Sequence, residues 1–419
     1  MATLTQTDSV LSVPEKRKQQ STFKALRNPN FRLYFGGQFI SISGTWMQNV
    51  AQGFLVFSLT KSEFWLGLVA CAAGLPMLFL SPYAGVIVER MPRRTLMIIS
   101  QTVQMLLAFI LAALTFSGTV QVWQIVTLAF LLGVTNAFDM PARLTLVVEV
   151  AGHDDMKSGI ALGSLLNSAG RVLGPTAAGV ALVKFGPAAC FLINGLSFVA
   201  VIISLYFMEV PYTKRKIDST SVLDQLKEGM RFARADVLIA PLLLLASLVG
   251  FFFVPVMQIM PAFADVILHS PKEAYAMMSM TLGIGSVIAG VSVSGLAGRL
   301  GYGRLIAVAT GLSAIATTIF AAQTTTSLAS VMSLFMGMFL VLQMISLNTS
   351  VQMAVPDQFR GRILSLYSLA LLGLAPFGAL VLGGLATIIG TGQAIAIYGV
   401  VGGLLSSAIL VRWPQVVGR

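Results

Sequence analysis

The chain has 419 residues, of which 56% are hydrophobic and only 10% are charged, and its formal net charge is +11. Ordinary soluble domains contain about 25% charged residues, so this composition excludes a soluble protein and indicates that lipid covers much of the surface. The basic residues fall in short connections between apolar segments. Membrane topology explains them there, and we expect no nucleic-acid partner.

Apolar segments long enough to cross a bilayer, which takes about 20 residues, recur along the whole chain. We expect twelve of them, at 32–58, 64–88, 95–116, 122–140, 158–183, 188–209, 237–260, 273–297, 304–323, 327–350, 363–389 and 391–411. The sequence therefore predicts an all-α integral membrane protein. With the N-terminus inside, most Lys and Arg lie on the cytoplasmic side, whereas Lys61, Lys184 and Lys272 lie outside. The positive-inside rule then places both termini in the cytoplasm.

Polar residues form a stripe along the first predicted span, at steps of three and four that keep them on one helical face. The stripe consists of Gln38, Ser41, Thr45, Gln48 or Asn49, and Gln52. Polar groups that face lipid raise the free energy, so we expect this face to line a hydrated cavity. Trp46 beside it offers a flat surface to an aromatic or amphipathic substrate. Hydrogen bonding between helices is the alternative explanation.

The connection after the second span reads GVIVERMPRRTL (85–96), and a weaker copy, SGLAGRLGYGRL (294–305), follows the eighth. The first copy resembles the signature of the major facilitator superfamily of transporters, with Glu in place of the usual Asp and Pro92 in place of a usual Gly. The resemblance implies two six-helix halves around a central site. It also implies a charged latch at the cytoplasmic mouth, in which Arg pairs with a carboxylate. Its members are Gly85, Glu89, Arg90, Arg93 and Arg94. Simple topology anchors are the alternative role for these arginines.

Two longer segments are similar to one branch of this superfamily, which contains the enterobactin exporter and macrolide-efflux proteins. They read NAFDMPARLTLVVEV (136–150) and AVPDQFRGRILSLYSLALLGLAPFG (354–378). The resemblance adds Asp139 and Arg143 to the latch. It does not identify the substrate.

The fifth span contains AGRVLGPTAAG (169–179), which resembles the pattern associated with antiporters of the superfamily. The residues that carry this resemblance are Gly170, Gly174, Pro175 and Gly179. They predict close packing and a bend in the helix. The resemblance implies export in exchange for protons, although a packed and bent helix does not require antiport.

Arg171 stands midway along the fifth span, where a charged side chain indicates function by default. It shares a polar face with Asn167, and we expect it to attract an anion or to control access to the cavity. Snorkelling, or structural pairing with Asp139, is the alternative. Gln343 and Ser346 form a shorter polar stripe on the tenth span. We place Asn167, Arg171, Gln343 and Ser346 in the substrate cavity with the stripe of the first span.

No carboxylate stands at the centre of a predicted span. Asp139 therefore either carries the coupling proton or belongs to the latch. Cys71 and Cys190 lie in apolar runs and are interpreted as buried apolar side chains. His153 and His269 lie in loops on opposite sides of the membrane. We therefore expect no metal site, and no cofactor other than a proton gradient.

One extended polar connection divides the chain. We expect a cytoplasmic tail (1–30), an N-terminal six-helix half (31–209), a cytoplasmic linker (210–236), a C-terminal six-helix half (237–412) and a second cytoplasmic tail (413–419). Leu223, Leu226, Met230 and Phe232 alternate with charges in the linker. They suggest an amphipathic helix at the membrane surface, with an ordinary charged linker as the alternative.

From these features and the resemblance we expect a secondary active transporter of the inner (plasma) membrane. It would export a small amphipathic molecule, such as a siderophore or a drug, by alternating access, and would work as a monomer. An importer or facilitator of the same fold is one alternative, and a non-transporting sensor or scaffold is another. An enzyme has no support, because the sequence contains no nucleotide-binding P-loop.

Overall fold

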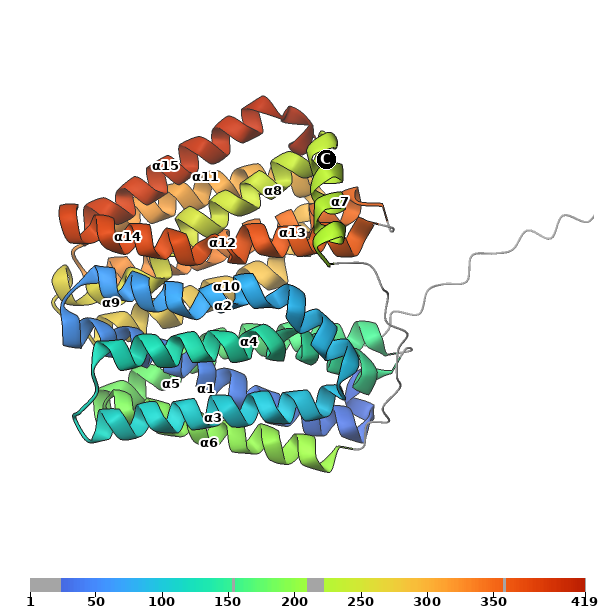
Figure 1. Ribbon diagram of the computed structural model, residues 1–419. Helices are drawn as coiled ribbons and strands as arrows, with labels where there is room; N and C mark the ends of the chain where they lie inside the picture. Colours follow the sequence, from blue (N-terminus) through green and yellow to red (C-terminus); the bar gives the residue numbers. More distant parts are fainter. Residues whose placement is uncertain (1–23, 153–154, 209–221, 357–358, 419) are drawn as a thin grey trace, which may run out of the picture.

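The computed structural model describes residues 24–152, 155–208, 222–356 and 359–418, and these residues are helical apart from short connections (Figure 1). A short 3-10 helix, η1 (Lys24–Arg27), precedes the first group of long helices. This N-terminal group comprises α1 (Pro29–Thr60), α2 (Glu63–Arg90), α3 (Arg93–Phe116), α4 (Val122–Ala151), α5 (Met156–Phe185) and α6 (Pro187–Phe207).

The C-terminal group follows α7 (Val222–Ala235), which lies in the predicted linker. It comprises α8 (Ile239–Leu248), the π-helical turn η2 (Val249–Phe253), α9 (Val256–Val266), α10 (Glu273–Leu300), α11 (Tyr302–Ala321), α12 (Thr326–Ala354), α13 (Arg360–Leu372), α14 (Ala375–Ile389), α15 (Thr391–Arg412) and η4 (Pro414–Val416). In Figure 1 the N-terminal group occupies the lower part of the molecule and the C-terminal group the upper part. The expected all-helical fold is confirmed.

Tight connections reverse the chain between several neighbouring helices. Asn28 begins α1 by accepting a hydrogen bond from the Asn30 amide at 2.9 Å, and Pro29 takes the first helical position, which its fixed φ favours. At the far end of α1, Lys61 has a φ of 48°. Gly186 and Gly390, with φ of 79° and 91°, join α5 to α6 and α14 to α15. Positive φ ends a helix, so these connections need almost no loop.

Two of the expected spans are interrupted near the middle. In the first, η2 separates α8 from α9, and Pro255 cannot donate a backbone hydrogen bond to continue the helix. In the second, α13 ends before Gly373 and α14 begins just ahead of Pro376. Within the described residues, ten candidate spans are long and apolar enough to cross a membrane, counting each interrupted span once. Helices α1 and α5, which carry the predicted polar stripes, are long but fall outside this set.

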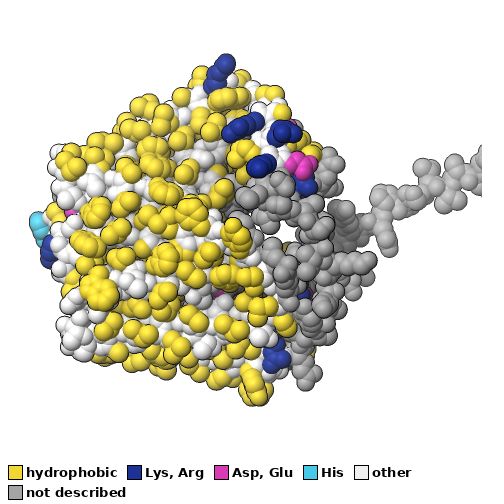
Figure 2. Space-filling model, viewed as in Figure 1, with side chains coloured by type: hydrophobic (Ala, Val, Ile, Leu, Met, Phe, Trp, Pro, Cys, Tyr) yellow, Lys and Arg dark blue, Asp and Glu magenta, His cyan; other side chains and the backbone are white. Residues whose placement is uncertain are grey.

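The two ends of the bundle differ. Helix α7 and the C-terminal end of the described chain lie at one end, here called the terminal end (Figure 1). The opposite end, here called the loop end, carries the α1–α2, α5–α6 and α14–α15 connections. Figure 2 shows that hydrophobic side chains cover most of the flank between them, whereas the visible charged side chains gather toward the two ends. This distribution matches a bundle surrounded by lipid.

The hydrophobic core of the described residues joins the two groups at the loop end. One cluster of buried residues spans both groups there, and it includes Met47, Leu66, Leu182, Phe263, Tyr275 and Leu382. At the terminal end, the cluster around Phe31 and Leu146 belongs to the N-terminal group alone, and the cluster around Leu242 and Leu366 to the C-terminal group alone. Among the described residues, no hydrophobic cluster connects the groups at the terminal end. The bundle is therefore packed shut at the loop end.

Helix α4 continues beyond the expected membrane span. The expected span ended at residue 140, before Pro141, but the helix continues to Ala151. Leu146, Val147 and Val150 are buried in the cluster around Phe31, so packing stabilises this extension. The Thr145 hydroxyl also donates to the Pro141 carbonyl at 2.9 Å. Tertiary packing thus outweighs the usual tendency of proline to end a helix.

Candidate transport site and the contacts that close it

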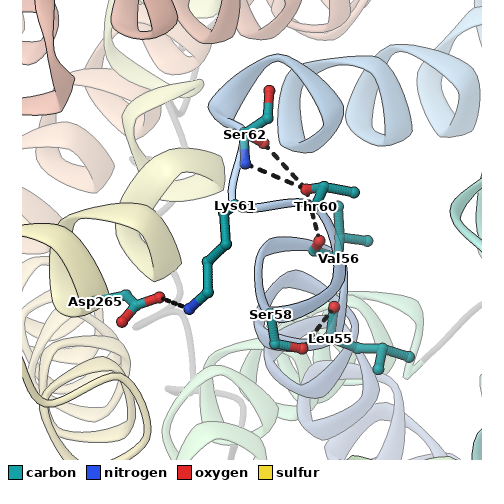
Figure 3. Close-up of polar contacts among 7 residues, drawn as sticks. All are labelled: Leu55, Val56, Ser58, Thr60, Lys61, Ser62 and Asp265. Carbon is teal, nitrogen blue, oxygen red and sulfur yellow. Dashed lines mark hydrogen bonds and ion pairs between the residues drawn. The ribbon is translucent and has the colours of Figure 1, made fainter.

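Polar contacts join the two groups at the loop end (Figure 3). Lys61, between α1 and α2, forms an ion pair with Asp265 of α9. Nearby, the Thr391 hydroxyl at the start of α15 donates to the Glu63 carboxylate at 2.7 Å, and both side chains are buried. The Ser62 amide donates to the Thr60 hydroxyl at 3.3 Å, which fixes the turn that carries Lys61. Sequence reasoning missed these contacts because the partners are remote in the chain.

Glycines allow the helices of the two groups to approach closely. A Cβ on Gly67 of α2 would lie 2.3 Å from the Ala379 carbonyl oxygen of α14, and one on Gly283 of α10 would lie 2.2 Å from the Arg171 carbonyl oxygen of α5. Side chains cannot fit at these distances, so both contacts require glycine. The helices in contact across the two groups are α2 with α14 and α5 with α10.

A substitution at Thr391 is expected to loosen the loop end. In Thr391→Val the buried Glu63 carboxylate loses its partner, which costs about 1–3 kcal/mol and favours separation of the groups by about 5- to 150-fold. The measurement is the rate of maleimide labelling of Ala379→Cys, a buried position on α14, in a protein whose buried Cys71 and Cys190 are replaced by Ala. The matched control is Thr387→Val, because that hydroxyl donates only to Gly383 of its own helix. Equal labelling rates in the two variants would contradict this role of Thr391.

The residues of the predicted polar stripe of α1 lie on two different sides of the helix. Gln48 accepts a hydrogen bond from Asn194 of α6 at 2.7 Å and is buried between the two helices. Ser41 is also buried, on the side where Gly37 and Gly44 lie against α6. For Gln48 the structure therefore shows the interhelical hydrogen bond that was the alternative explanation. Asn49 is exposed, Thr45 and Gln52 are half-buried, and Gln38 is buried without a hydrogen bond to either side-chain atom.

The face of α1 that carries Thr45 and Asn49 turns toward the C-terminal group. Gly53, one helical turn after Asn49, lies against Pro261 of α9 and Tyr275 of α10. Residues four apart share a helical face, so Thr45, Asn49 and Gly53 face the same way. This face borders the region between the groups.

Arg171 of α5 and Trp46 of α1 are in contact in this region. The Arg171 guanidinium carbon lies 5.2 Å from the centre of the Trp46 ring, which is a cation–π contact. Both side chains are half-buried, and the Arg171 Nε is buried with no hydrogen-bond partner. Asn167, one turn earlier on α5, is exposed and donates only to the Gly163 carbonyl of its own helix at 3.3 Å.

The small residues of α5 determine how closely α1 approaches Arg171. A Cβ on Gly170 would lie 2.4 Å from Ile42, and one on Gly174 would lie 2.4 Å from the Cβ of Trp46. Gly179 instead faces Ala276 of α10, and Pro175 is buried within the continuous helix. The glycines of the span-five pattern thus place α5 against both its neighbours.

Gln343 and Ser346 lie inside the C-terminal group. The Gln343 amide donates to the Thr310 hydroxyl of α11 at 2.6 Å, and both Gln343 and Ser346 are fully buried. The Gln343 Oε1 and the Ser346 hydroxyl have no hydrogen-bond partner. The structure therefore does not bring these two residues together with Arg171 and Trp46.

The charged latch residues whose side chains the structure describes make their polar contacts within the N-terminal group. Arg143 contacts the buried Asp139 at 2.6 Å, and the Gln101 amide of α3 donates to the same carboxylate at 2.9 Å. Arg93 pairs with Glu149 of α4 at 3.3 Å, and sequence reasoning missed this partner. Arg94 donates from its Nε to the Leu205 carbonyl of α6 at 2.6 Å. The side chains of Gly85, Glu89 and Arg90 lie outside the described residues.

The fold and these contacts define a multi-span membrane transporter built from two helix groups. The family model described as "Transmembrane secretion effector" matches residues 20–416. The chain belongs to this family, a branch of the major facilitator transporters, as the sequence motifs indicated.

Named relatives agree with this family. The chain is 22% identical over 385 residues to the staphyloferrin A transporter of Staphylococcus aureus, which covers 88% of this chain and 92% of that protein. It is 27% identical over 241 residues to the uncharacterized MFS-type transporter YfiS of Bacillus subtilis, a match that spans about half of each chain, 56% and 55%. It is 20% identical over 263 residues to macrolide efflux protein A of Streptococcus pyogenes, covering 62% of this chain and 65% of that one.

Solved structures share the fold. The nucleoside transporter NupG superposes with a TM-score of 0.71 at 14% identity, covering 91% of this chain and 98% of its own. A bacterial homologue of the lysosomal transporter Spinster superposes with a TM-score of 0.68 at 13% identity, covering 93% and 96%. At such identities these likenesses establish the architecture alone.

Proposed function

We propose that this protein is a secondary active exporter of small amphipathic molecules that works by alternating access and is driven by a proton gradient. The observation that carries the proposal is the packing of the two helix groups. Among the described residues, the groups share a hydrophobic cluster and the Lys61–Asp265 and Thr391–Glu63 contacts at the loop end, while each has its own cluster at the terminal end. This arrangement is expected for an alternating-access transporter in a conformation that is closed at one end. The named relatives, which include a siderophore transporter and a macrolide efflux protein, support an amphipathic substrate.

The proposed topology follows from the same arrangement. All twelve expected spans cross a bacterial inner membrane, including the more polar α1 and α5, and the terminal end faces the cytoplasm. The two six-helix halves then extend over 31–209 and 237–412, joined by the cytoplasmic linker at 210–236 and flanked by the tails at 1–30 and 413–419. The basic residues at the terminal end support this orientation, and the closed loop end makes this the inward-facing state. We propose that one monomer carries the complete pathway.

Export is tested by dye accumulation in cells. Cells that express the protein are expected to retain less of a fluorescent amphipathic dye than cells that carry an empty vector. A protonophore is expected to abolish the difference, because it collapses the gradient that drives exchange. Increased accumulation on expression would instead support an importer, and a difference that survives the protonophore would contradict proton coupling.

A further inference from the structure

The Arg171 side chain, midway along α5, is a cation with no anionic partner among the described residues. It makes no ion pair or hydrogen bond with any described residue, and its Nε is buried. All carboxylates whose side chains the structure describes have a partner elsewhere; they are Glu63, Asp139, Glu149, Asp155, Glu228, Asp236, Asp265 and Glu273. The Arg171 charge is therefore left for a group that is not part of the described chain.

An unpaired charge in a low-dielectric region is unfavourable, and a bound anion offsets that cost. A guanidinium binds a carboxylate through two parallel hydrogen bonds. A cationic ligand would add repulsion, and a neutral one would leave the charge uncompensated. The electrostatics of this site therefore favour an anionic group such as a carboxylate.

Trp46 adds a requirement for shape. Its ring is held beside Arg171 because Gly170 and Gly174 let α1 pack closely on α5. Both side chains keep part of their surface exposed. A flat apolar body attached to the carboxylate can pack against the indole while the guanidinium holds the acid.

The site also adjoins the contact between the groups. Gly283 of α10 packs on the backbone carbonyl of Arg171 itself, so Arg171 belongs to the interface that must separate when the loop end opens. A ligand bound to this side chain is in a position to influence that contact. The Arg171 side chain thus lies beside the α5–α10 contact that changes when the groups separate.

We infer that Arg171 and Trp46 form the recognition subsite for the carboxylate of a flat, amphipathic, anionic substrate. The inference rests on the proposed export function and specifies its substrate class. It assigns the acid to Arg171 and the apolar body to Trp46. Anionic amphipathic molecules are then the preferred cargo over neutral molecules of the same shape.

The test is binding of 2-naphthoate and 2-naphthamide, which share a shape and differ in charge, to the purified full chain by isothermal titration calorimetry. The unchanged protein is expected to bind the acid about tenfold more tightly than the amide, as one charge-assisted contact predicts. Arg171→Gln is expected to remove this preference, Arg171→Lys to retain part of it, and Trp46→Leu to weaken both ligands. The matched control is Arg412→Gln, since Arg412 also stacks on a tryptophan, Trp413, at 6.0 Å but outside this site.

Equal binding of acid and amide by the unchanged protein would overturn the inference, and so would an acid preference that persists in Arg171→Gln. If Arg171→Gln fails to fold, Arg171→Lys still tests the inference. This variant keeps the charge and removes the planar guanidinium, so its preference for the acid over the amide must be smaller than that of the unchanged protein. The proposed export function and the carboxylate subsite can fail independently. If the protein exports nothing but still binds the acid through Arg171, the export function is contradicted and the subsite is not. If Arg171→Gln exports naphthoate normally, the carboxylate subsite is contradicted and the export function is not.

Discussion

A Gly283→Leu protein is expected to reach the membrane and to lose transport. A Cβ at this position would lie 2.2 Å from the Arg171 carbonyl oxygen, so the leucine forces α10 away from α5. Overpacking of this kind costs about 1–3 kcal/mol. That energy shifts a two-state equilibrium about 5- to 150-fold away from the state closed at the loop end.

The measurement combines dye efflux with maleimide labelling of the buried Ala379→Cys position. Gly290→Leu is the matched control on the same helix, because Gly290 is exposed and has nothing within 4 Å of its position for a side chain. Gly67→Leu is expected to have the same effect as Gly283→Leu through the α2–α14 contact. Wild-type efflux by Gly283→Leu would show that the close α5–α10 contact is not needed for transport.

Asp139→Ala is expected to cause the largest loss of stability. Asp139 is 2% exposed and is the ion-pair partner of Arg143. Its removal leaves the Arg143 cation, whose side chain is 26% exposed, without its ion-pair partner, which costs about 1–3 kcal/mol. Thermal unfolding in detergent measures the effect as a lower Tm.

The comparison variant is Asp265→Ala, which breaks a more exposed ion pair between an aspartate and the lysine Lys61. The Lys61 side chain is 65% exposed, so loss of this pair is expected to change stability by about 0–1 kcal/mol. The double variant Asp139→Asn with Arg143→Met is expected to recover much of the loss, because it removes both charges. Equal Tm values for Asp139→Ala and Asp265→Ala would show that burial does not govern these two pairs.

The sequence was sufficient to predict where the helices lie along the chain. It was poorly suited to predict which face of each helix packs against a neighbouring helix. Length and apolarity determine where a span lies, and the expected span at 95–116 coincides closely with α3. Ser41 and Gln48 fit a stripe facing a cavity, but they pack on α6, because the neighbouring glycines at 37 and 44 draw α6 to that side. Polarity alone does not distinguish a cavity from a packed polar interface.

Partners remote in the chain were beyond prediction for a related reason. Glu63 and Thr391 are separated by 328 residues, and nothing in either local sequence identifies the other. The role of Glu149 could have been suspected, because a carboxylate in an apolar stretch near the end of α4 requires a partner, and Arg93 supplies it. The weak internal repeat did not predict these contacts either. Its two copies lie at the ends of α2 and α10, whereas the contacts across the groups pair α2 with α14 and α5 with α10.

The division of the hydrophobic core into clusters separates the stability of each helix group from the contact between the groups. The clusters around Phe31 and Leu242 each lie within one helix group, so they remain intact if the groups rotate as rigid bodies. Among the described residues, the cluster at the loop end is the one that spans both groups, and its contacts between the groups must separate. Substitutions where the two groups meet in the shared cluster are therefore expected to change the switching rate, whereas substitutions in the clusters around Phe31 and Leu242 are expected to change the stability of one half.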